Sequence, residues 1–284
     1  MASLTPYGII ANPKAGPEDH SYKEGKLNEL KKVLGNTCMV AGLDTESPEE
    51  FQECIRELEK QVETLIIAGG DGTVNKVINT LTQPRTLAYL PWGSGNALKY
   101  ALGLPEELHD MDSSIRNGTS HYVDLISDGT TRGFITSFGF DGLALQERDE
   151  SRLTGIWGYI LSTAKAGIKY KRKPITLTLD GTEYEIPKAL SIIVTKSKFY
   201  GYGLEIVPEA KKDDGRLHVK IITSSLPFVA CALLRGDSIG EHHECLEAKI
   251  ESETPLPFQI DGTPHGERTE VNLEVLPNAA CFKF

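Results

Sequence analysis

A glycine-rich turn at residues 69–73, with the sequence GGDGT, constrains the fold of this chain more than any other feature. The apolar run before it, residues 64–68 (TLIIA), is typical of a strand buried on both faces of a parallel sheet. The residues after it, 74–81, carry apolar side chains at helical spacing. A strand, a tight turn and a helix in this order predict one unit of a parallel α/β domain.

The rest of the first 110 residues continues this alternation of strands and helices. One helix start is especially clear, because Ser47 can cap the helix, Pro48 suits its first position and Glu50 completes a capping box. We expect further strands at residues 7–11, 37–41 and 86–90, and helices at residues 23–34, 48–60 and 97–102.

The pattern changes after about residue 120, where short β-branched or alternating segments are separated by Gly, Asp and Pro. These segments predict an antiparallel β-rich domain, interrupted by one helical stretch at residues 153–169. We therefore predict an α/β domain at residues 1–120 and an all-β domain at residues 121–284. The expected strands include residues 175–179, 191–195, 217–222, 247–250 and 271–275.

The net charge and the cysteine pattern indicate which ligands and which cellular compartment suit this chain. The formal net charge of −10 argues against general nucleic-acid binding, which needs a basic surface. The five cysteines are scattered without a CxxC pair, which favours a reducing compartment. The sequence has no signal-peptide pattern and no apolar run near the roughly 20 residues that span a membrane. We expect a cytoplasmic protein, with peripheral membrane contact as an open alternative.

Two more glycine-rich turns follow predicted strands, NPKAG at residues 12–16 and PWGSGN at residues 91–96. Glycines let the backbone approach a ligand, and free N–H groups at a helix start attract anions. Three such turns predict a polyphosphate site, although each alone is also explained as a turn that needs glycine for its geometry. Asp71 lies in the second turn, where a carboxylate would repel phosphate unless it serves a metal or accepts a proton.

The three turns, in this order, resemble the successive motifs of the diacylglycerol kinase catalytic-domain family, which includes bacterial lipid kinases and sphingosine kinases. The resemblance continues in GFD at residues 139–141, in residues 200–217 and in IDG at residues 260–262. It implies a Rossmann-like nucleotide-binding domain, similar to NAD kinase and phosphofructokinase, followed by a β-sandwich that holds the lipid. It also implies ATP and Mg²⁺ as cofactors, and transfer of the γ-phosphoryl group to a lipid hydroxyl.

The resemblance also implies roles for individual residues. Asp71 and Asp261 would be the catalytic carboxylates, with Asp71 as metal-linked organiser or general base. Arg152 and Lys14 are the basic candidates for the transferred phosphoryl group. The full set of nucleotide-binding candidates is Asn12, Lys14, Thr45, Gly69, Gly70, Gly72, Thr73, Gly93, Ser94, Gly95, Asn96 and Arg152.

A structural magnesium site is implied at Asp214, with the backbone carbonyls of Lys211 and Arg216 as further ligands. Oxygen ligands of this kind suit magnesium. The alternative is an Asp-Gly turn that leads into the strand at residue 217. Residues 242–245 (HHEC) also contain metal-ligand types, but no second cluster lies at zinc spacing, so surface or strand-edge residues are expected there.

Two positions depart from the family pattern. Thr263 stands where the family has the glutamate of its DGE motif, and Tyr202 interrupts the family's triple glycine. Because threonine cannot act as a base at neutral pH, a catalytically impaired lipid- or nucleotide-binding protein is the alternative to an active kinase. NAD kinase shares the GGDGT turn, but the Asn-Glu dyad of that family is not found here.

The stretch at residues 156–173 combines apolar, aromatic and basic side chains. It suits transient contact with a membrane surface, or else a packed helix with a solvated basic end. The expected partner is a lipid substrate, and a homodimer stays open. The sequence does not name the lipid.

Overall fold

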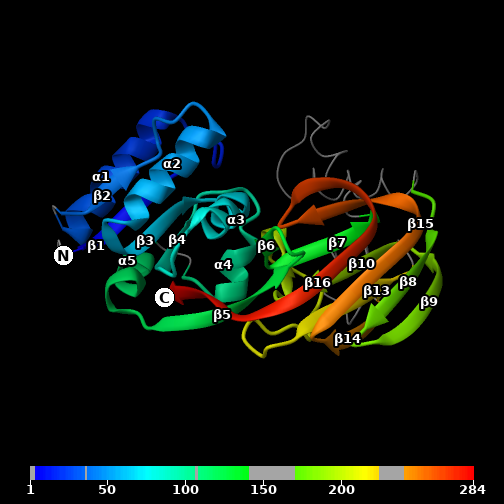
Figure 1. Cartoon of the computed structure of the whole chain (residues 1–284). Helices are drawn as coiled ribbons and strands as arrows, with labels where there is room; N and C mark the ends of the chain where they lie inside the picture. The colour runs from blue at the N-terminus through cyan, green and yellow to red at the C-terminus, as the bar shows by residue number, and fades with distance from the viewer. Residues whose placement is uncertain (1–3, 36, 106–107, 141–169, 224–239) are drawn as a thin grey trace. The chain divides into compact units, whose positions relative to one another are not determined.

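The computed structural model describes residues 4–35, 37–105, 108–140, 170–223 and 240–284 (Figure 1). The chain divides into two compact units. The first comprises Met1–Val123 and Ala279–Phe284, and the second comprises Asp124–Asn278. The sequence placed the boundary at 120/121 and assigned residues 279–284 to the second domain, whereas these residues return to the first unit.

The first unit contains a parallel sheet with the strand order β4-β3-β1-β2. Residues near the end of β16 add a further parallel pairing, with Cys281 opposite Thr86 and Phe282 opposite Leu87, which explains their return to this unit. The strands are β1 (Thr5–Ala11), β2 (Met39–Ala41), β3 (Val62–Gly69), β4 (Thr86–Pro91) and the end of β16 (Thr263–Lys283).

Five helices of the described chain belong to this unit: α1 (His20–Leu34), α2 (Pro48–Glu59), α3 (Asp71–Thr80), α4 (Ala97–Leu102) and α5 (Leu108–Asn117). Leu30 of α1 and Ile115 of α5 join one buried cluster with Ile9 of β1 and Ile66 of β3. Helices α2 and α3 contact each other and β3. The predicted capping box is confirmed at α2, where Ser47 accepts the Glu50 N–H at 3.1 Å.

The second unit is antiparallel, as predicted. Its main sheet has the order β14-β13-β10-β7-β15-β16. Off this path, β8 pairs with β15 and with β9, and β5 pairs with β16 and with β6. The strands are β5 (Ser120–Ser127), β6 (Arg132–Gly133), β7 (Ile135–Gly139), β8 (Lys173–Leu179), β9 (Thr182–Ala189), β10 (Ser191–Thr195), β11 (Phe199–Tyr200), β12 (Leu204–Glu205), β13 (Leu217–Ile222), β14 (Glu241–Cys245) and β15 (Glu247–Ile260); the short 3-10 helix η1 spans Gly201–Gly203.

Burial in the second unit indicates a sheet covered on both faces, because every residue of β10 and of β13 is buried. Two hairpins, β8–β9 and β15–β16, turn through Asp-Gly pairs with positive φ. Asp180 has φ 46° and Asp261 has φ 48°, the left-handed geometry that two-residue hairpin turns use. The helix predicted at residues 153–169 lies outside the described residues.

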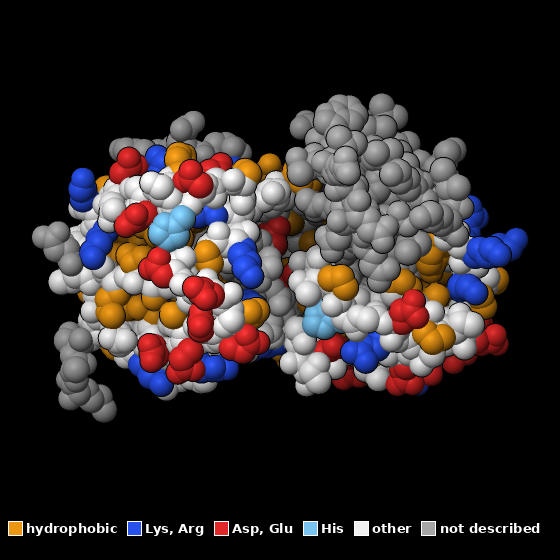
Figure 2. Space-filling model, turned by 90° about the horizontal axis from the view of Figure 1, so that it is seen from above, with side chains coloured by type: hydrophobic (Ala, Val, Ile, Leu, Met, Phe, Trp, Pro, Cys, Tyr) orange, Lys and Arg blue, Asp and Glu red, His pale blue; other side chains and the backbone are white. Residues whose placement is uncertain are grey.

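In the part of the chain that the structure describes, no helix is both long and apolar enough to cross a membrane. Figure 2 shows one face of the molecule, on which Lys and Arg side chains are interspersed with Asp and Glu.

Candidate active site

The three glycine-rich turns follow β1, β3 and β4, which lie side by side in the parallel sheet. The register places Ala11 opposite Ala68, and Gly69 opposite Pro91, so these strands end at one edge. In open α/β sheets this carboxyl edge is where ligands bind. The structure thus brings the three predicted motifs together.

Glycine is required where the turns touch. A Cβ atom on Gly93 would lie 2.6 Å from Cα of Gly70 and 2.8 Å from Oδ1 of Asn96. A Cβ atom on Gly16, which has φ 70°, would overlap the carbonyl oxygen of Trp92. The backbone N–H of Trp92 also donates to the Gly69 carbonyl at 2.7 Å. The turns therefore pack on one another through bare backbone.

Asn12 connects the first turn to the second. Its Nδ2 donates to Oγ1 of Thr73 at 2.8 Å, and its Oδ1 accepts the N–H of Lys14 at 2.9 Å. Its backbone N–H donates to the Ala68 carbonyl at 2.9 Å. These contacts fix the side chain that the motif match had assigned to nucleotide binding.

Asp71 is the first residue of α3, and its half-buried carboxylate bonds to the start of α4. Oδ2 accepts the N–H of Ala97 at 2.9 Å, and Oδ1 accepts the N–H of Leu98 at 3.0 Å. Asn96, at the N-cap of α4, forms no side-chain cap, so Asp71 caps this helix from the neighbouring turn. Burial raises the pKa of Asp71, and the N–H groups of Leu98 and Ala97 oppose that rise without cancelling it.

A pocket of about 110 Å³ lies between the first turn, the segment after β2 and the start of α3. Five of the predicted nucleotide-binding residues line it: Asn12, Lys14, Thr45, Gly72 and Thr73. Lys76 also lines it and was missed by motif matching, although it lies one helical turn after Gly72. Lys14 and Lys76 bring positive charge to this pocket, opposed by the carboxylate of Glu46.

The third turn lies outside this pocket's lining. Nδ2 of Asn96 donates to the Gly93 carbonyl at 2.6 Å, and Oδ1 accepts the Tyr89 hydroxyl at 3.1 Å. Asn96 therefore shapes the turn that carries the exposed Ser94 and the half-buried Gly95. Arg152 lies outside the described residues.

Asp261 occupies the turn between β15 and β16 in the second unit. Its Oδ1 accepts the N–H groups of Phe134 and Ile135, each at 2.9 Å. The side chain thus secures the β15–β16 turn to the segment that leads into β7. Thr263, the residue in place of the family's glutamate, is exposed at the first position of β16.

Comparison with known proteins gives a match for each unit. The description "Diacylglycerol kinase catalytic domain" matches residues 6–127, and "YegS C-terminal NAD kinase beta sandwich-like domain" matches residues 134–281. The chain belongs to the diacylglycerol kinase-like family of lipid kinases. Its predicted fold, an α/β domain followed by a β-sandwich, is confirmed.

Curated relatives of this lipid kinase family can be aligned with most of the chain. A "Probable lipid kinase YegS-like" of Stenotrophomonas maltophilia is 28% identical over 241 residues, covering 76% of this chain and 77% of the relative. The "Probable lipid kinase YegS" of Salmonella arizonae is 28% identical over 239 residues, covering 77% of each chain.

Solved structures show the same fold. A diacylglycerol kinase from Bacillus anthracis superposes with a TM-score of 0.82 at 22% identity, covering 100% of this chain and 98% of that chain. An NAD kinase from Archaeoglobus fulgidus, solved in complex with ATP, has a TM-score of 0.55 at 14% identity, covering 99% of this chain and 94% of that chain. The likeness to NAD kinase is therefore one of fold.

The lipid kinase family's triple glycine is interrupted here by Tyr202, which has φ 65° and ψ 18°. This left-handed conformation suits glycine and costs a side-chain-bearing residue about 1–2 kcal/mol. Tyr202 therefore adopts a backbone conformation that favours glycine.

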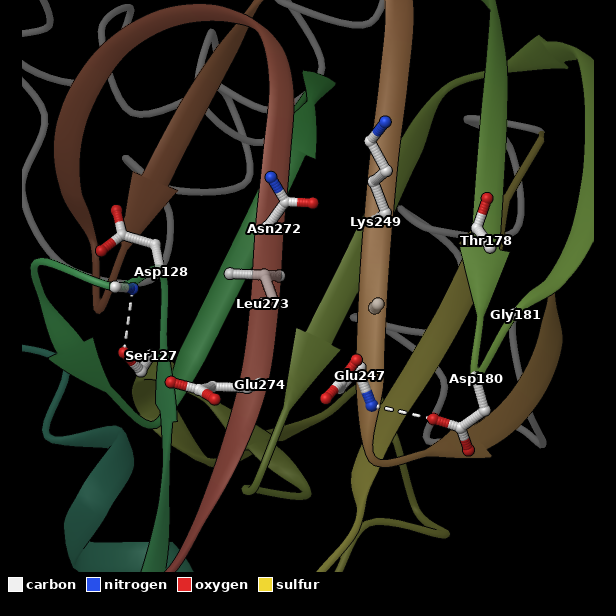
Figure 3. A pocket seen from close by; sticks show the side chains of 12 residues that line it. Ser127, Asp128, Thr178, Asp180, Gly181, Glu247, Lys249, Asn272, Leu273 and Glu274 are labelled. Carbon is white, nitrogen blue, oxygen red and sulfur yellow. Dashed lines mark hydrogen bonds between the residues drawn. The ribbon is translucent and has the colours of Figure 1, made fainter.

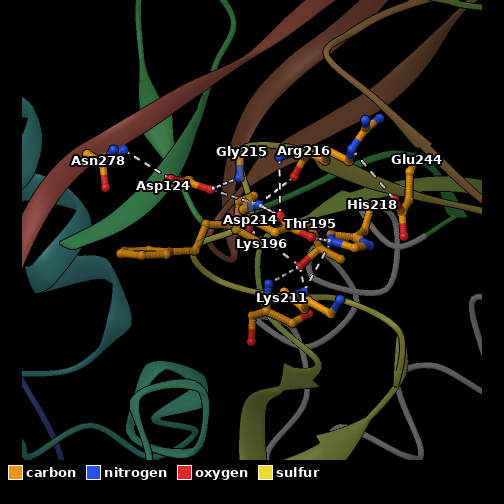
Figure 4. A network of polar contacts seen from close by, with 12 residues as sticks. Asp124, Thr195, Lys196, Lys211, Asp214, Gly215, Arg216, His218, Glu244 and Asn278 are labelled. Atoms are coloured by element: carbon orange, nitrogen blue, oxygen red, sulfur yellow. Dashed lines mark hydrogen bonds and ion pairs between the residues drawn. The ribbon is translucent and has the colours of Figure 1, made fainter. Parts of the chain in front are cut away.

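The magnesium ligands predicted at Asp214 and Arg216 do not fit a divalent cation in this chain (Figure 4). Oδ1 of Asp214 and the carbonyl oxygen of Arg216 both accept from the Lys196 ammonium, at 2.6 and 2.5 Å. The third predicted ligand, the backbone carbonyl of Lys211, stays a prediction; the N–H of Lys211 donates to Nε2 of His218 at 3.1 Å. An ammonium group thus lies between Asp214 and Arg216, where a metal ion was expected.

Most of the residues that line a pocket of about 350 Å³ in the second unit have polar or charged side chains (Figure 3). Its carboxylates come from Asp128, Asp180, Glu247 and Glu274, and Lys249 also borders it. An acyl chain needs apolar walls, so this pocket does not match the lipid tail that the family resemblance implies.

Proposed function

We propose that this chain is an ATP-dependent lipid kinase that transfers the γ-phosphoryl group to a lipid hydroxyl, that of diacylglycerol, a sphingoid base or a similar lipid. The observation that carries the proposal is the convergence of three glycine-rich turns at one sheet edge, beside a pocket lined by Asn12, Thr45, Thr73 and two lysines. Phosphate groups fit such an edge, because backbone N–H groups and lysines meet their charge there.

In this proposal, different residues of the first unit bind different parts of the nucleotide phosphates. Gly72 leaves space for an anion at the N-terminus of α3, since a Cβ atom there would meet nothing within 4 Å. The side chains of Asn12 and Thr73, hydrogen-bonded to each other, lie beside it. Lys14 and Lys76 oppose the negative charge of the transferred group. Magnesium bound with the nucleotide would supply further charge neutralisation on the phosphate oxygens.

Asp71 is the proposed general base. The lipid hydroxyl must lose a proton as it attacks, and a carboxylate with a raised pKa accepts that proton more readily than an ordinary one. Each oxygen of Asp71 accepts one backbone N–H and keeps further acceptor capacity. We assign Asp261 the supporting carboxylate role, which leaves Thr263 without a proton-transfer task.

The test is incubation of the purified chain with γ-labelled ATP, Mg²⁺ and micelles of diacylglycerol, ceramide or sphingosine. We expect label in one lipid fraction and none on NAD. Absence of labelled lipid from every acceptor, together with absence of ATP binding, would refute the kinase assignment. ATP binding without transfer, restored by Thr263→Glu, would instead support the impaired-kinase alternative.

Localisation and partners belong to the same proposal. We infer a cytoplasmic enzyme that contacts membranes transiently through residues 156–173, of which residues 156–169 lie outside the described structure. Sedimentation with anionic vesicles tests the contact, and light scattering tests for a homodimer.

A further inference from the structure

The second unit contains a lysine ammonium enclosed by oxygen atoms. Nζ of Lys196 lies 2.6 Å from Oδ1 of Asp214, 3.1 Å from Oδ2 of Asp124 and 2.5 Å from the carbonyl oxygen of Arg216 (Figure 4). The Lys196 side chain has no exposed surface, while those of Asp124 and Asp214 are 2% and 19% exposed. We call these three oxygens and the ammonium the Lys196 cage.

The chemistry of the cage is that of a hard cation site. Two carboxylates and a backbone carbonyl are the ligands that Mg²⁺ and Ca²⁺ take. Burying two ionised carboxylates without a cation is strongly unfavourable, so a positive charge is needed between them to balance their charge. Lys196 supplies that charge from within the chain.

The ammonium and a metal exclude each other from this position. Magnesium needs oxygens at about 2.0–2.1 Å, so an ion bound to the same three oxygens would overlap Nζ. Two cations so close together would also repel strongly in a buried site. Occupation by Lys196 therefore closes the cage to divalent ions.

The remaining capacity of the two carboxylates is taken by backbone N–H groups and by His218, whose Nε2 lies 2.9 Å from Oδ2 of Asp214. Asp124 accepts the N–H of Gly215 at 2.7 Å and the N–H of Asn278 at 3.0 Å. Asp214 accepts the N–H of Arg216 at 3.2 Å. Because Asp124 and Asn278 are the terminal residues of the second unit, the cage joins both ends of that unit to the turn at residues 212–216.

We propose that Lys196 is an internal substitute for a structural divalent cation, so that the second unit is held together without a metal, and that removing its ammonium converts the cage into a divalent-metal site. The proposal goes beyond lipid phosphorylation. It holds or fails whether or not the chain is a kinase, because its test uses neither nucleotide nor lipid.

The chain offers a matched control in Lys220, a second lysine whose side chain has no exposed surface. Its Nζ lies 3.1 and 3.3 Å from the two oxygens of Glu209, whose side chain is 35% exposed. Glu209 is the one carboxylate paired with Lys220 among the described ion pairs, and water can reach it. Removal of Lys220 is therefore not expected to create a metal site.

The experiment counts Mn²⁺ ions bound per chain by electron paramagnetic resonance, with Mn²⁺ as the spin-active substitute for Mg²⁺. We expect Lys196→Ala to bind one more Mn²⁺ than the wild type, and the double variant with Asp214→Asn to lose it. Lys220→Ala should match the wild type. Because His218, His242 and Glu244 offer ligand atoms within 4.8 Å of one another, the count is repeated with His242→Ala added to Lys196→Ala, and the extra ion should persist.

Two results would overturn the proposal. One is a wild-type Mn²⁺ site that disappears in Asp214→Asn, since the cage would then hold a metal beside Lys196. The other is a folded Lys196→Ala chain that binds no additional ion. Where Lys196→Ala does not fold, the wild-type comparison decides: the Mn²⁺ count must be unchanged by Asp214→Asn, and EDTA must leave the thermal unfolding midpoint unchanged.

Discussion

At the residue scale, Asp71 combines a structural contact with the proposed chemical role. Its carboxylate caps α4, whose residues lie 26 and 27 positions away in the sequence. Motif matching finds the residue but not this contact, because hydrogen bonds between distant segments leave no local pattern. A loss of activity on substitution therefore has two physical origins that need separate measurements.

Asp71→Asn separates these two origins. An amide cannot take the lipid proton, so we expect the rate of lipid phosphorylation to fall by about 10²–10⁴-fold. One of the two α4 N–H groups also loses its acceptor, so a drop in unfolding free energy of about 1–3 kcal/mol is expected. Lipid phosphorylation and urea unfolding are measured on the same preparation. A folded variant with a nearly unchanged rate would remove Asp71 from the proton-transfer step.

The pH dependence of the rate tests the same carboxylate. Burial raises the pKa of Asp71 above the ordinary 3.8, so the proton-accepting form is lost at a higher pH than for an exposed aspartate. We expect the lipid phosphorylation rate to fall, as the pH decreases, around a pKa above 3.8. The residual rate of Asp71→Asn should lack this limb. Identical acid limbs in both chains would assign the titration to another group.

The raised pKa of Asp71 makes folding stability depend on pH in the opposite direction to that of an ion-paired carboxylate, whose pKa is lowered. The folded state holds the Asp71 proton more tightly than the unfolded state, because its pKa is raised. This contribution to stability is present at low pH and is lost as the pH rises through the folded-state pKa. Above that pKa, ionised Asp71 lowers the stability of the folded state because the carboxylate is buried, and the N–H groups of Leu98 and Ala97 offset part of this loss.

At the element scale, the three turns act as one packed assembly. Gly70 and Gly93 face each other, so neither turn can accept a side chain without moving the other. Lys76 brings α3 into the same pocket as the first turn. The close approach of the turns at this sheet edge therefore requires glycine at positions 70 and 93.

Gly93→Ala tests this packing. Its Cβ would lie 2.6 Å from Cα of Gly70, and backbone cannot rotate away as a side chain can. We expect a loss of about 1–3 kcal/mol in unfolding free energy, by overpacking, and weaker ATP binding. The measurements are urea unfolding and nucleotide titration by calorimetry.

Gly25→Ala is the control for Gly93→Ala. Gly25 lies within α1, and a Cβ there meets nothing within 4 Å. Alanine should stabilise the helix by about 0.5–1 kcal/mol and leave nucleotide binding unchanged. Equal effects of both substitutions would show that close approach of the turns is unimportant.

Elements that are determined by neighbouring residues could be predicted from the sequence, whereas contacts between distant residues could not. The α2 capping box, the buried β3 and the Asp-Gly turn at residues 213–215 follow from neighbouring residues, and local rules found them. The Lys196 cage joins residues up to 154 positions apart, counting the Asn278 contact, so no spacing rule reveals it. The magnesium prediction named two of the three cage oxygens, those of Asp214 and Arg216, and missed that of Asp124. It also had no means of placing Lys196, the residue after β10, between them.

At the scale of the whole molecule, the chain passes between its units twice, after Val123 and after Asn278. The sequence predicted the first passage closely, because composition changes there, and missed the second, because residues 279–283 continue the strand β16 without a break. Pairing of Cys281 with Thr86 depends on a strand that lies far away in sequence. A TM-score of 0.82 at 22% identity shows that the fold is shared despite extensive differences in sequence.

Acid unfolding of the whole chain should depend on the Lys196 cage. Burial raises the pKa of Asp214, but the hydrogen bond and charge of Lys196 outweigh it and leave that pKa below 3.8. This stabilisation is therefore complete above pH 3.8 and is lost as the pH falls through the lowered pKa.

Lys196→Met removes the charge and keeps the side-chain length, so burial then dominates and the pKa of Asp214 rises. The variant's unfolding free energy should begin to fall at a higher pH than that of the wild type. Urea unfolding from neutral pH to about pH 3 measures the difference between the curves. Lys220→Met is the control, with a smaller change expected because Glu209 is more exposed. Parallel wild-type and Lys196→Met curves over this range would mean that the ammonium does not govern Asp214, and the cage would then owe its stability to its backbone donors and to His218.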